Sequence, residues 1–155
     1  MANPNDVAAL AAAFTKAQYE VPELGTAGIV RVGVVAQALE QVLPASGYAF
    51  ITAWNPDSQA SSRMDNDRAD GALAAELDAL EVRRLRAFAS DAQGGHREHG
   101  WLVLDLPLAG IDRLARHFGQ DGALAWGAGE AVRLRLYHAA PGAAADLEPW
   151  IDWVG

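Results

Sequence analysis

The sequence predicts an α/β fold of the mixed α+β kind, a single domain built on a mixed sheet of about five or six strands with about four helices. Three observations lead to this prediction. The chain has 155 residues, the length of a single domain. Of these residues 51% are apolar, so the chain can bury a core. Apolar residues recur with helical spacing in some segments and form short runs between Gly, Pro and Asn in others.

In the N-terminal half we expect two helices and two strands. Asp6 can cap a first helix that ends before Pro22. Residues 29–32 are β-branched and flanked by glycines, which favours a strand, and residues 34–43 have helical spacing. The apolar run 48–54 is a second strand, and if the two strands are neighbours they are parallel with a right-handed crossover. The side chains expected to face inward from the two helices are Val7, Leu10, Ala11, Phe14, Gln18, Val35, Leu39 and Val42.

In the C-terminal half the pattern predicts two helices and four strands. A helix over residues 67–80 would be capped by Asn66 or Asp65. Residues 82–89 and 100–106 are typical of an antiparallel hairpin with a long polar tip. The remaining elements are an amphipathic helix after Pro107 that carries Ile111, Leu114, Ala115 and Phe118, and short strands at 123–126 and 131–137.

The end of the chain is expected to lie outside this domain, which divides the protein into a domain of residues 1–140 and a C-terminal extension of residues 141–155. The alanine- and glycine-rich stretch from residue 139 has the composition of a linker. Trp150 and Trp153 would share one face of a helical turn. Because large aromatic side chains seldom stay exposed, we expect this tail to pack on the body of the domain or on a second copy of the chain.

Composition argues against several classes of function. The chain has no cysteine, which excludes disulfides, thiolate nucleophiles and cysteine-ligated zinc. A net charge of −8, from 12 basic and 20 acidic side chains, argues against binding to bulk nucleic acid. No apolar run approaches about 18 residues, so we expect no membrane-spanning helix. The N-terminus lacks the basic start of a signal peptide, and we expect a cytoplasmic protein.

The stretch from Tyr48 to Asn66 is the strongest candidate for a site. Its apolar strand ends at Trp54, where Asn55 and Pro56 interrupt it: proline has no N–H to donate and pushes the preceding residue toward extended backbone. A loop rich in Ser and Asp then leads to a helix N-terminus, a combination that often holds ligands in α/β folds. The structural alternative is that Trp54 belongs to the core and Asn55 only stabilises the turn.

Residues 96–99 place His96, Glu98 and His99 close together in the chain. A metal site would need all three side chains to converge. In an extended segment, however, His96 and Glu98 share one face and His99 points to the other, so we expect no metal. A Walker loop, a complete dinucleotide fingerprint and a Gly-x-Ser-x-Gly elbow are all missing, and the sequence therefore predicts no cofactor.

Five short motifs stand out: Ala13–Tyr19 (AFTKAQY), Ile51–Pro56 (ITAWNP), Asn66, Glu98 before a Gly-Trp strand, and Leu114–Gln120 (LARHFGQ). Their order and spacing resemble a bacterial family catalogued only as a domain of unknown function, number 3293. The likeness covers roughly residues 8–127. It implies a small single-domain cytoplasmic protein and implies no particular reaction. The positions that match the family's motifs are Asn55, Asn66, Glu98 and Gln120.

These considerations give five candidate ligand-binding residues and assign no catalytic residue. The candidates are Trp54, Asn55, Asn66, Glu98 and Gln120. For the last two a structural interpretation is also open. Gln120 follows a helix end, and Glu98 can be an exposed loop acid or pair with Arg97 or another nearby arginine. Side-chain amides do not ionise, so they suit the recognition of a polar ligand better than acid–base catalysis.

The leading prediction is a non-enzymatic binding or regulatory module that takes a small polar or anionic ligand in a polar pocket near Asn55. One alternative is a small hydrolase or transferase acting on a polar metabolite or nucleotide, with Glu98 as base. Another is a protein-interaction domain, or a self-associating protein, that uses Trp150 and Trp153. A cleft in which Glu98 meets the amides would favour the enzyme.

Overall fold

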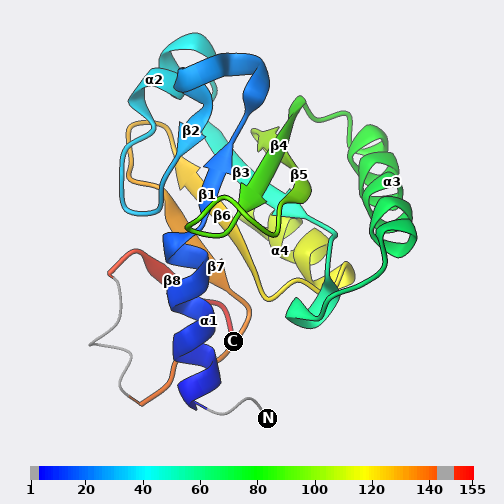
Figure 1. The fold of residues 1–155 in the computed structure, drawn as a ribbon. Helices are drawn as coiled ribbons and strands as arrows, with labels where there is room; N and C mark the ends of the chain where they lie inside the picture. The colour runs from blue at the N-terminus through cyan, green and yellow to red at the C-terminus, as the bar shows by residue number, and fades with distance from the viewer. Residues whose placement is uncertain (1–3, 143–148) are drawn as a thin grey trace.

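The computed structural model describes residues 4–142 and 149–155 of the chain (Figure 1). The described residues form one eight-stranded sheet with the strand order β2-β1-β4-β5-β3-β6-β7-β8. The strands are β1 (Gln18–Glu20), β2 (Ile29–Val30), β3 (Gly47–Thr52), β4 (Arg84–Ser90), β5 (Glu98–Leu104), β6 (Gly122–Gly127), β7 (Arg133–Leu136) and β8 (Ile151–Trp153). The helices are α1 (Pro4–Lys16), η1 (Pro22–Gly28), α2 (Gln37–Val42), η2 (Pro56–Ser58), α3 (Arg63–Ala79) and α4 (Leu108–His117).

The α/β fold class is confirmed, but the strand count of about five or six was too low. The two unexpected strands, β1 and β8, have three residues each, too few to show a periodic pattern. The β4–β5 hairpin and the β6–β7 pair are antiparallel as expected. The parallel pair of β2 and β3 does not form, because β1, β4 and β5 lie between them.

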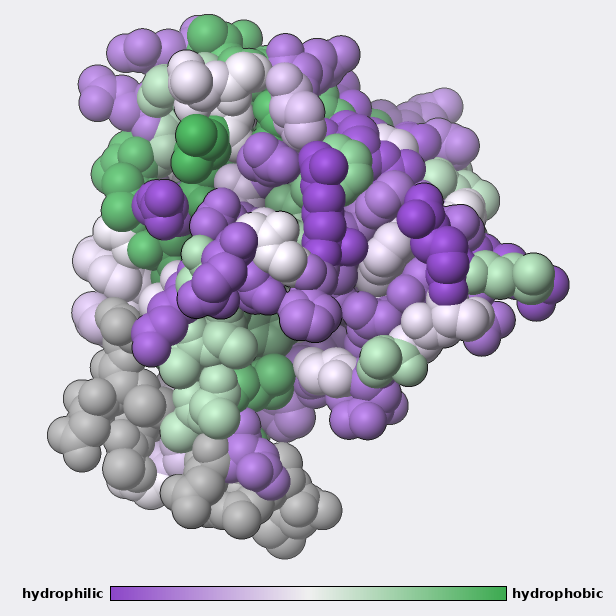
Figure 2. Space-filling model, in the orientation of Figure 1, coloured by the Kyte–Doolittle hydropathy of each residue, from purple (hydrophilic) through white to green (hydrophobic). Residues whose placement is uncertain are grey.

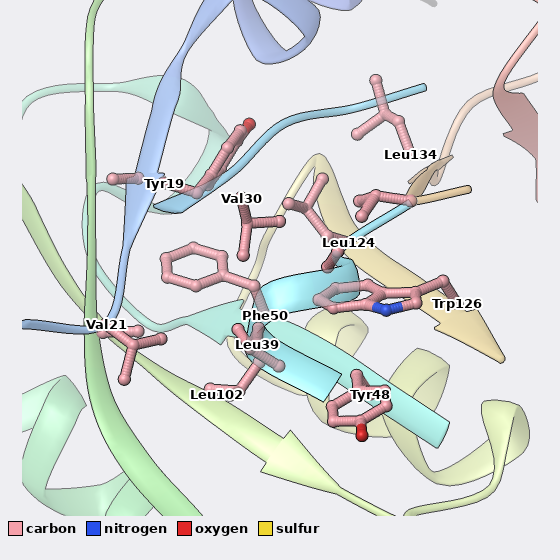
Figure 3. Packing of buried hydrophobic residues seen from close by; sticks show 14 of the residues in the cluster. Tyr19, Val21, Val30, Leu39, Tyr48, Phe50, Leu102, Leu124, Trp126 and Leu134 are labelled. Carbon is pink, nitrogen blue, oxygen red and sulfur yellow. The ribbon is translucent and has the colours of Figure 1, made fainter. Parts of the chain in front are cut away.

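The sheet separates two apolar clusters on its opposite faces. Along β5, Leu102 and Leu104 pack into one cluster and Val103 into the other, because successive side chains of a strand alternate in direction. The first cluster includes residues of α1, η1 and α2, and the second includes residues of α3 and α4 (Figure 1). In the first cluster Tyr19 meets Phe50 edge to face, with ring centroids 5.3 Å apart (Figure 3).

The two N-terminal helices differ from the prediction. α1 begins at Pro4, so Asp6 lies in its first turn instead of preceding it as a cap. α1 ends at Lys16, since the chain enters β1 directly, and the expected inward residue Gln18 is an exposed strand residue. Val7 and Ala11 are buried as expected.

α2 has six residues, fewer than expected, and its single buried residue is Leu39. Val42, at its end, is exposed. Val35 precedes the helix, is exposed, and forms an isolated antiparallel bridge with Ala131. The bridge uses backbone that a longer helix would need, which explains why the helix starts late.

The end of the chain packs on the body of the protein. β8 pairs in parallel with β7 and forms one edge of the sheet, and the side chain of Trp153 packs against the first apolar cluster. Trp150 lies on Gly33, where a Cβ atom would come within 2.5 Å of the indole. The expected linker falls partly on residues 143–148, which lie outside the described residues. The division at residue 140 stays a prediction.

No helix in the described part of the chain is long and apolar enough to cross a membrane.

Candidate functional site

The candidate site begins where β3 ends. β3 stops at Thr52, and Asn55 adopts left-handed backbone with φ of 48° before Pro56 starts η2. The sequence predicted extended backbone here, because a following proline disfavours helical values. The left-handed conformation is one that asparagine tolerates better than most residues, and the hydrogen bonds of its side chain hold it in place.

Asn55 and Asn66 form a reciprocal pair. The backbone N–H of Asn55 donates to Asn66 Oδ1 at 2.9 Å, and Asn66 Nδ2 donates back to Asn55 Oδ1 at 2.9 Å. The N–H of Ser61 also donates to Asn55 Oδ1, at 3.0 Å. These bonds tie the first turn of α3 to the loop that follows β3.

The predicted cap of α3 at Asn66 or Asp65 was wrong. α3 begins at Arg63, and the cap is Ser62, whose Oγ accepts from the N–H of Asp65 at 3.0 Å. Ser62 has extended backbone, as an N-cap requires. Asn66 therefore lies inside the helix with only 4% of its surface exposed, and its amide supports Asn55.

Glu98, the first residue of β5, meets Asn55 across this loop. Asn55 Nδ2 donates to Glu98 Oε1 at 2.7 Å. Burial raises the pKa of the Glu98 carboxyl, and the hydrogen bond from Asn55 opposes that shift. The second carboxylate oxygen, Oε2, forms no hydrogen bond with the described residues and is not fully buried. The alternative in which Glu98 pairs with Arg97 is not observed, and Arg97 pairs with Glu20 instead.

Trp54 and Gln120 lie outside the cavity and hold the segment that carries Asn55. Trp54 is 7% exposed, and its indole stacks on the ring of His99 with centroids 4.5 Å apart. Gln120 is 9% exposed, and its Nε2 donates to the carbonyl oxygen of Trp54 at 3.0 Å. Gln120 thus holds the backbone next to Asn55, and the Trp54 ring anchors the same segment against His99.

A cavity of about 280 Å³ lies between α1 and the sheet, beside Asn55 and Glu98. Its apolar wall includes Leu10, Phe14, Tyr19, Phe50, Ala89 and Leu124. Its polar end includes Asn55, Ser58, Ser90, Asp91, His96 and Glu98. In Figure 2 the alanine-rich surface of α1 is pale green below the purple side chains of the β4–β5 loop, so apolar and polar surface meet at this place.

The five candidate residues therefore cluster, but they do not all line the cavity. Asn55 and Glu98 line it, whereas Trp54, Asn66 and Gln120 form the support behind Asn55. The sequence reasoning missed the apolar wall, because it assigned Phe14 of α1 only to the core. The alanine-rich face of α1 could have pointed to the cavity, since small side chains leave room beside a sheet.

The residues of the 96–99 segment diverge. Glu98 lines the cavity, and the ring of His99 lies on the other face of the sheet, against Trp54. His96 Nδ1 lies 2.8 Å from Asp91 Oδ2 at the mouth of the cavity. The part of the chain that the structure describes holds no cluster of three or more histidine and acidic side chains placed for a metal ion.

The fold and the site define a mixed α/β protein with one curled sheet and an amphipathic cavity at the end of its third strand. Residues 51–123 match the family described as "Protein of unknown function (DUF3293)", which confirms the predicted resemblance over that segment. The match contains all five candidate residues, while α1, β1, Phe50 and Leu124 of the apolar wall lie outside it. No curated protein matches the chain, and no solved structure does.

Proposed function

We propose that this protein is a non-enzymatic binding module for a small amphipathic molecule, held in the cavity between α1 and the sheet. The observation that carries the proposal is the Asn55–Glu98 pair at one end of a cavity whose other walls are apolar. Ligand sites commonly combine a mostly apolar concavity with a few fixed polar groups that orient the ligand. At about 280 Å³ the cavity suits a small metabolite.

The support behind Asn55 strengthens this interpretation. A buried network of Asn66, Gln120 and Trp54 holds the loop through its backbone and side-chain atoms. Preorganisation of this kind lowers the entropic cost of binding, because the polar group does not need to be ordered by the ligand. A turn that served only to connect β3 and α3 would not require Asn55 to face a cavity.

The geometry does not support the anionic ligand that the sequence suggested. Asn66 uses its side chain within the protein, and Ser62 caps α3. Among the described residues that line the cavity there is no arginine or lysine, whereas Asp91 and Glu98 are both acidic. The proposal therefore keeps a small ligand near Asn55 but no longer expects that ligand to be an anion.

The proposal is tested by thermal-shift measurements with a library of small amphipathic molecules. Ala13 is exposed on α1 and lines the cavity, so Ala13→Phe can cover its mouth at little cost in stability. Ala9→Phe adds the same ring at another exposed position of α1, one turn earlier and outside the cavity lining, and is the matched control. We expect ligands that shift the wild type and Ala9→Phe but not Ala13→Phe. Equal shifts in both variants would place the ligand elsewhere, and a library without effect would contradict the proposal.

A second candidate function is a small hydrolase or transferase that uses Glu98 as base. The raised pKa of the Glu98 carboxyl, caused by burial, favours it, because catalytic carboxyls are commonly shifted toward neutrality. Against it, Asn66 and Gln120 do not reach the cavity, so Asn55 alone would orient a substrate. Any molecule that binds should be incubated with the protein and followed by NMR. Turnover that disappears in Glu98→Gln while binding persists would favour the enzyme.

A further inference from the structure

We propose that the polar group recognised by this cavity is a primary ammonium, so that the ligand is a small amine with an apolar body. The inference rests on the proposed function, because it names the ligand class of the same cavity. It follows from three features of the cavity: its charges, its uncommitted polar atoms and the shape of its polar end.

The charges of the cavity favour a cation. Two carboxylates, Asp91 and Glu98, belong to its lining. Tyr19 of β1 and His96 of the β4–β5 loop are the other titratable groups among the described lining residues, which include no arginine or lysine. The nearest basic side chain in sequence, Arg97, is paired with Glu20 at 3.1 Å. A protein with a net charge of −8 also attracts cations at long range.

The hydrogen bonds at the polar end leave an acceptor free. The Tyr19 hydroxyl donates to the Phe14 carbonyl oxygen at 2.6 Å, and the Thr52 hydroxyl donates to the His99 carbonyl oxygen at 2.6 Å. The side-chain oxygen Oδ1 of Asn55 accepts from both the Ser61 N–H and Asn66 Nδ2. Glu98 Oε2, in contrast, has no partner among the described residues. An ionised carboxylate only accepts, so its partner in a ligand must be a donor.

The occupied oxygen of Glu98 selects among cations. A guanidinium binds a carboxylate best through both oxygens, but Oε1 already accepts from Asn55. A quaternary ammonium has no hydrogen to donate to Oε2. A primary ammonium can donate one hydrogen to Oε2 and its others to water or to further acceptors of the polar end. The carbon skeleton then extends along Phe14, Phe50 and Leu124.

Burial of Glu98 gives the interaction a characteristic pH dependence. Burial raises the pKa of the Glu98 carboxyl, and only the ionised carboxylate can pair with an ammonium. Amine affinity should therefore rise as pH increases through the pKa of Glu98, until the amine itself loses its proton. A ligand with a carboxylate would show the opposite trend, since it would bind beside the protonated form.

The test is isothermal titration of the full chain with hexylamine, hexanol, hexanoate and hexyltrimethylammonium, which share one apolar chain. We expect hexylamine to bind at least about tenfold more tightly than hexanol, the ratio that a single charge-assisted hydrogen bond of about 1.4 kcal/mol supplies. In Glu98→Gln this preference should disappear while hexanol binds as before, because glutamine still accepts from Asn55. Glu23→Gln, on the exposed surface of η1 and outside the cavity lining, is the charge-matched control and should keep the preference.

The outcomes separate this inference from the function on which it rests. Equal binding of hexylamine and hexanol, or stronger binding of hexanoate, would overturn the amine assignment and leave a binding module for another small molecule. If the preference for hexylamine persists in Glu98→Gln but is lost in Asp91→Asn, the ammonium binds Asp91 at the mouth of the cavity, and the role of Glu98 is overturned. Failure of all four probes to bind the wild type would contradict both proposals.

Discussion

Glu98 is the residue on which the chemistry of the site depends, because its carboxylate is the acidic group that the Asn55 loop holds directly. Folding moves this group from water into a partly apolar cavity, where the charged form is less well solvated. The hydrogen bond from Asn55 compensates for part of the solvation that the carboxylate loses. The raised pKa shows that the loss of solvation is the larger effect.

We expect Glu98→Gln to stabilise the protein at neutral and alkaline pH. The folded state holds the Glu98 proton more tightly than the unfolded state, so the wild type loses stability as pH rises from about 4.3, the ordinary glutamate pKa, through the raised folded value. The gain should reach about 1.4 kcal/mol for each pKa unit of displacement and should vanish at pH values below the ordinary pKa. Urea unfolding curves over a pH series measure it. A gain that is the same at every pH would show that packing, not ionisation, is responsible.

Asn66 has a structural role that the sequence could not separate from ligand binding. Replacing it with alanine would leave the Asn55 N–H and the Asn55 Oδ1 short of partners in a partly buried place. We expect Asn66→Ala to lower the free energy of unfolding by about 1–3 kcal/mol. A matched control is Asp67→Ala. Asp67 is the next residue of α3 but is exposed, so its replacement should change the stability little. An unchanged melting temperature in Asn66→Ala would contradict the structural role.

At the level of elements, α3 is attached to the sheet through an ion pair as well as through Leu73 and Leu77. Arg86 of β4 binds both carboxylate oxygens of Asp70, at 2.8 and 2.9 Å. The guanidinium of Arg86 also lies over the Trp101 ring, 3.6 Å from its centroid. The arrangement fixes α3, and with it the Asn66 amide that supports the loop after β3.

We expect Asp70→Asn to destabilise the protein by about 1–3 kcal/mol, because it breaks a bidentate pair between a mostly buried carboxylate and a half-buried arginine. The exposed pair of Arg63 and Asp67 is its matched control. There, Asp67→Asn should cost at most about 0.5 kcal/mol, as is usual for a solvent-exposed pair four residues apart in a helix. Chemical denaturation of both variants compares the two pairs. Equal effects would mean that α3 is held by its leucines alone.

Elements with long apolar runs could be predicted from sequence, and elements defined by pairing could not. The apolar run of β3 and the β4–β5 hairpin were predicted within a few residues, because burial of a whole strand leaves a local pattern. β1 and β8 have three residues each and exist because neighbouring strands supply their partners. A pairing between distant segments leaves no periodic trace in either one.

The same distinction applies to the site at the level of the whole molecule. Trp54, Asn55 and Asn66 were predicted together, because a strand that ends in Trp-Asn-Pro marks a change of direction in the sequence itself, whereas Gln120 was predicted through the resemblance to the family's motifs. A pocket near Asn55 was predicted, but its apolar walls were not, because they come from α1, β1, β3, β4, β5 and β6. Those elements meet only through the strand order of the completed sheet.

The C-terminal segment is part of the sheet, and its removal provides a test at the scale of the molecule. β8 contributes the buried side chain of Ile151, and Asp152 accepts hydrogen bonds from Arg133 at 2.8 and 3.0 Å. We expect deletion of residues 141–155 to lower the free energy of unfolding by about 3 kcal/mol or more, since a buried isoleucine alone contributes about 1.5–3 kcal/mol. Differential scanning calorimetry should show a melting temperature lower by roughly 6 °C or more.

Two measurements separate the possible roles of that segment. Ile151→Ala keeps the chain length and removes one buried side chain, so it should reproduce part of the loss without removing the tryptophans. Light scattering coupled to size exclusion then compares the mass of the wild type and of the truncated chain. A lower oligomeric state after truncation would support self-association through Trp150 and Trp153. If mass and melting temperature are both unchanged, the pairing of β8 with β7 does not contribute to stability.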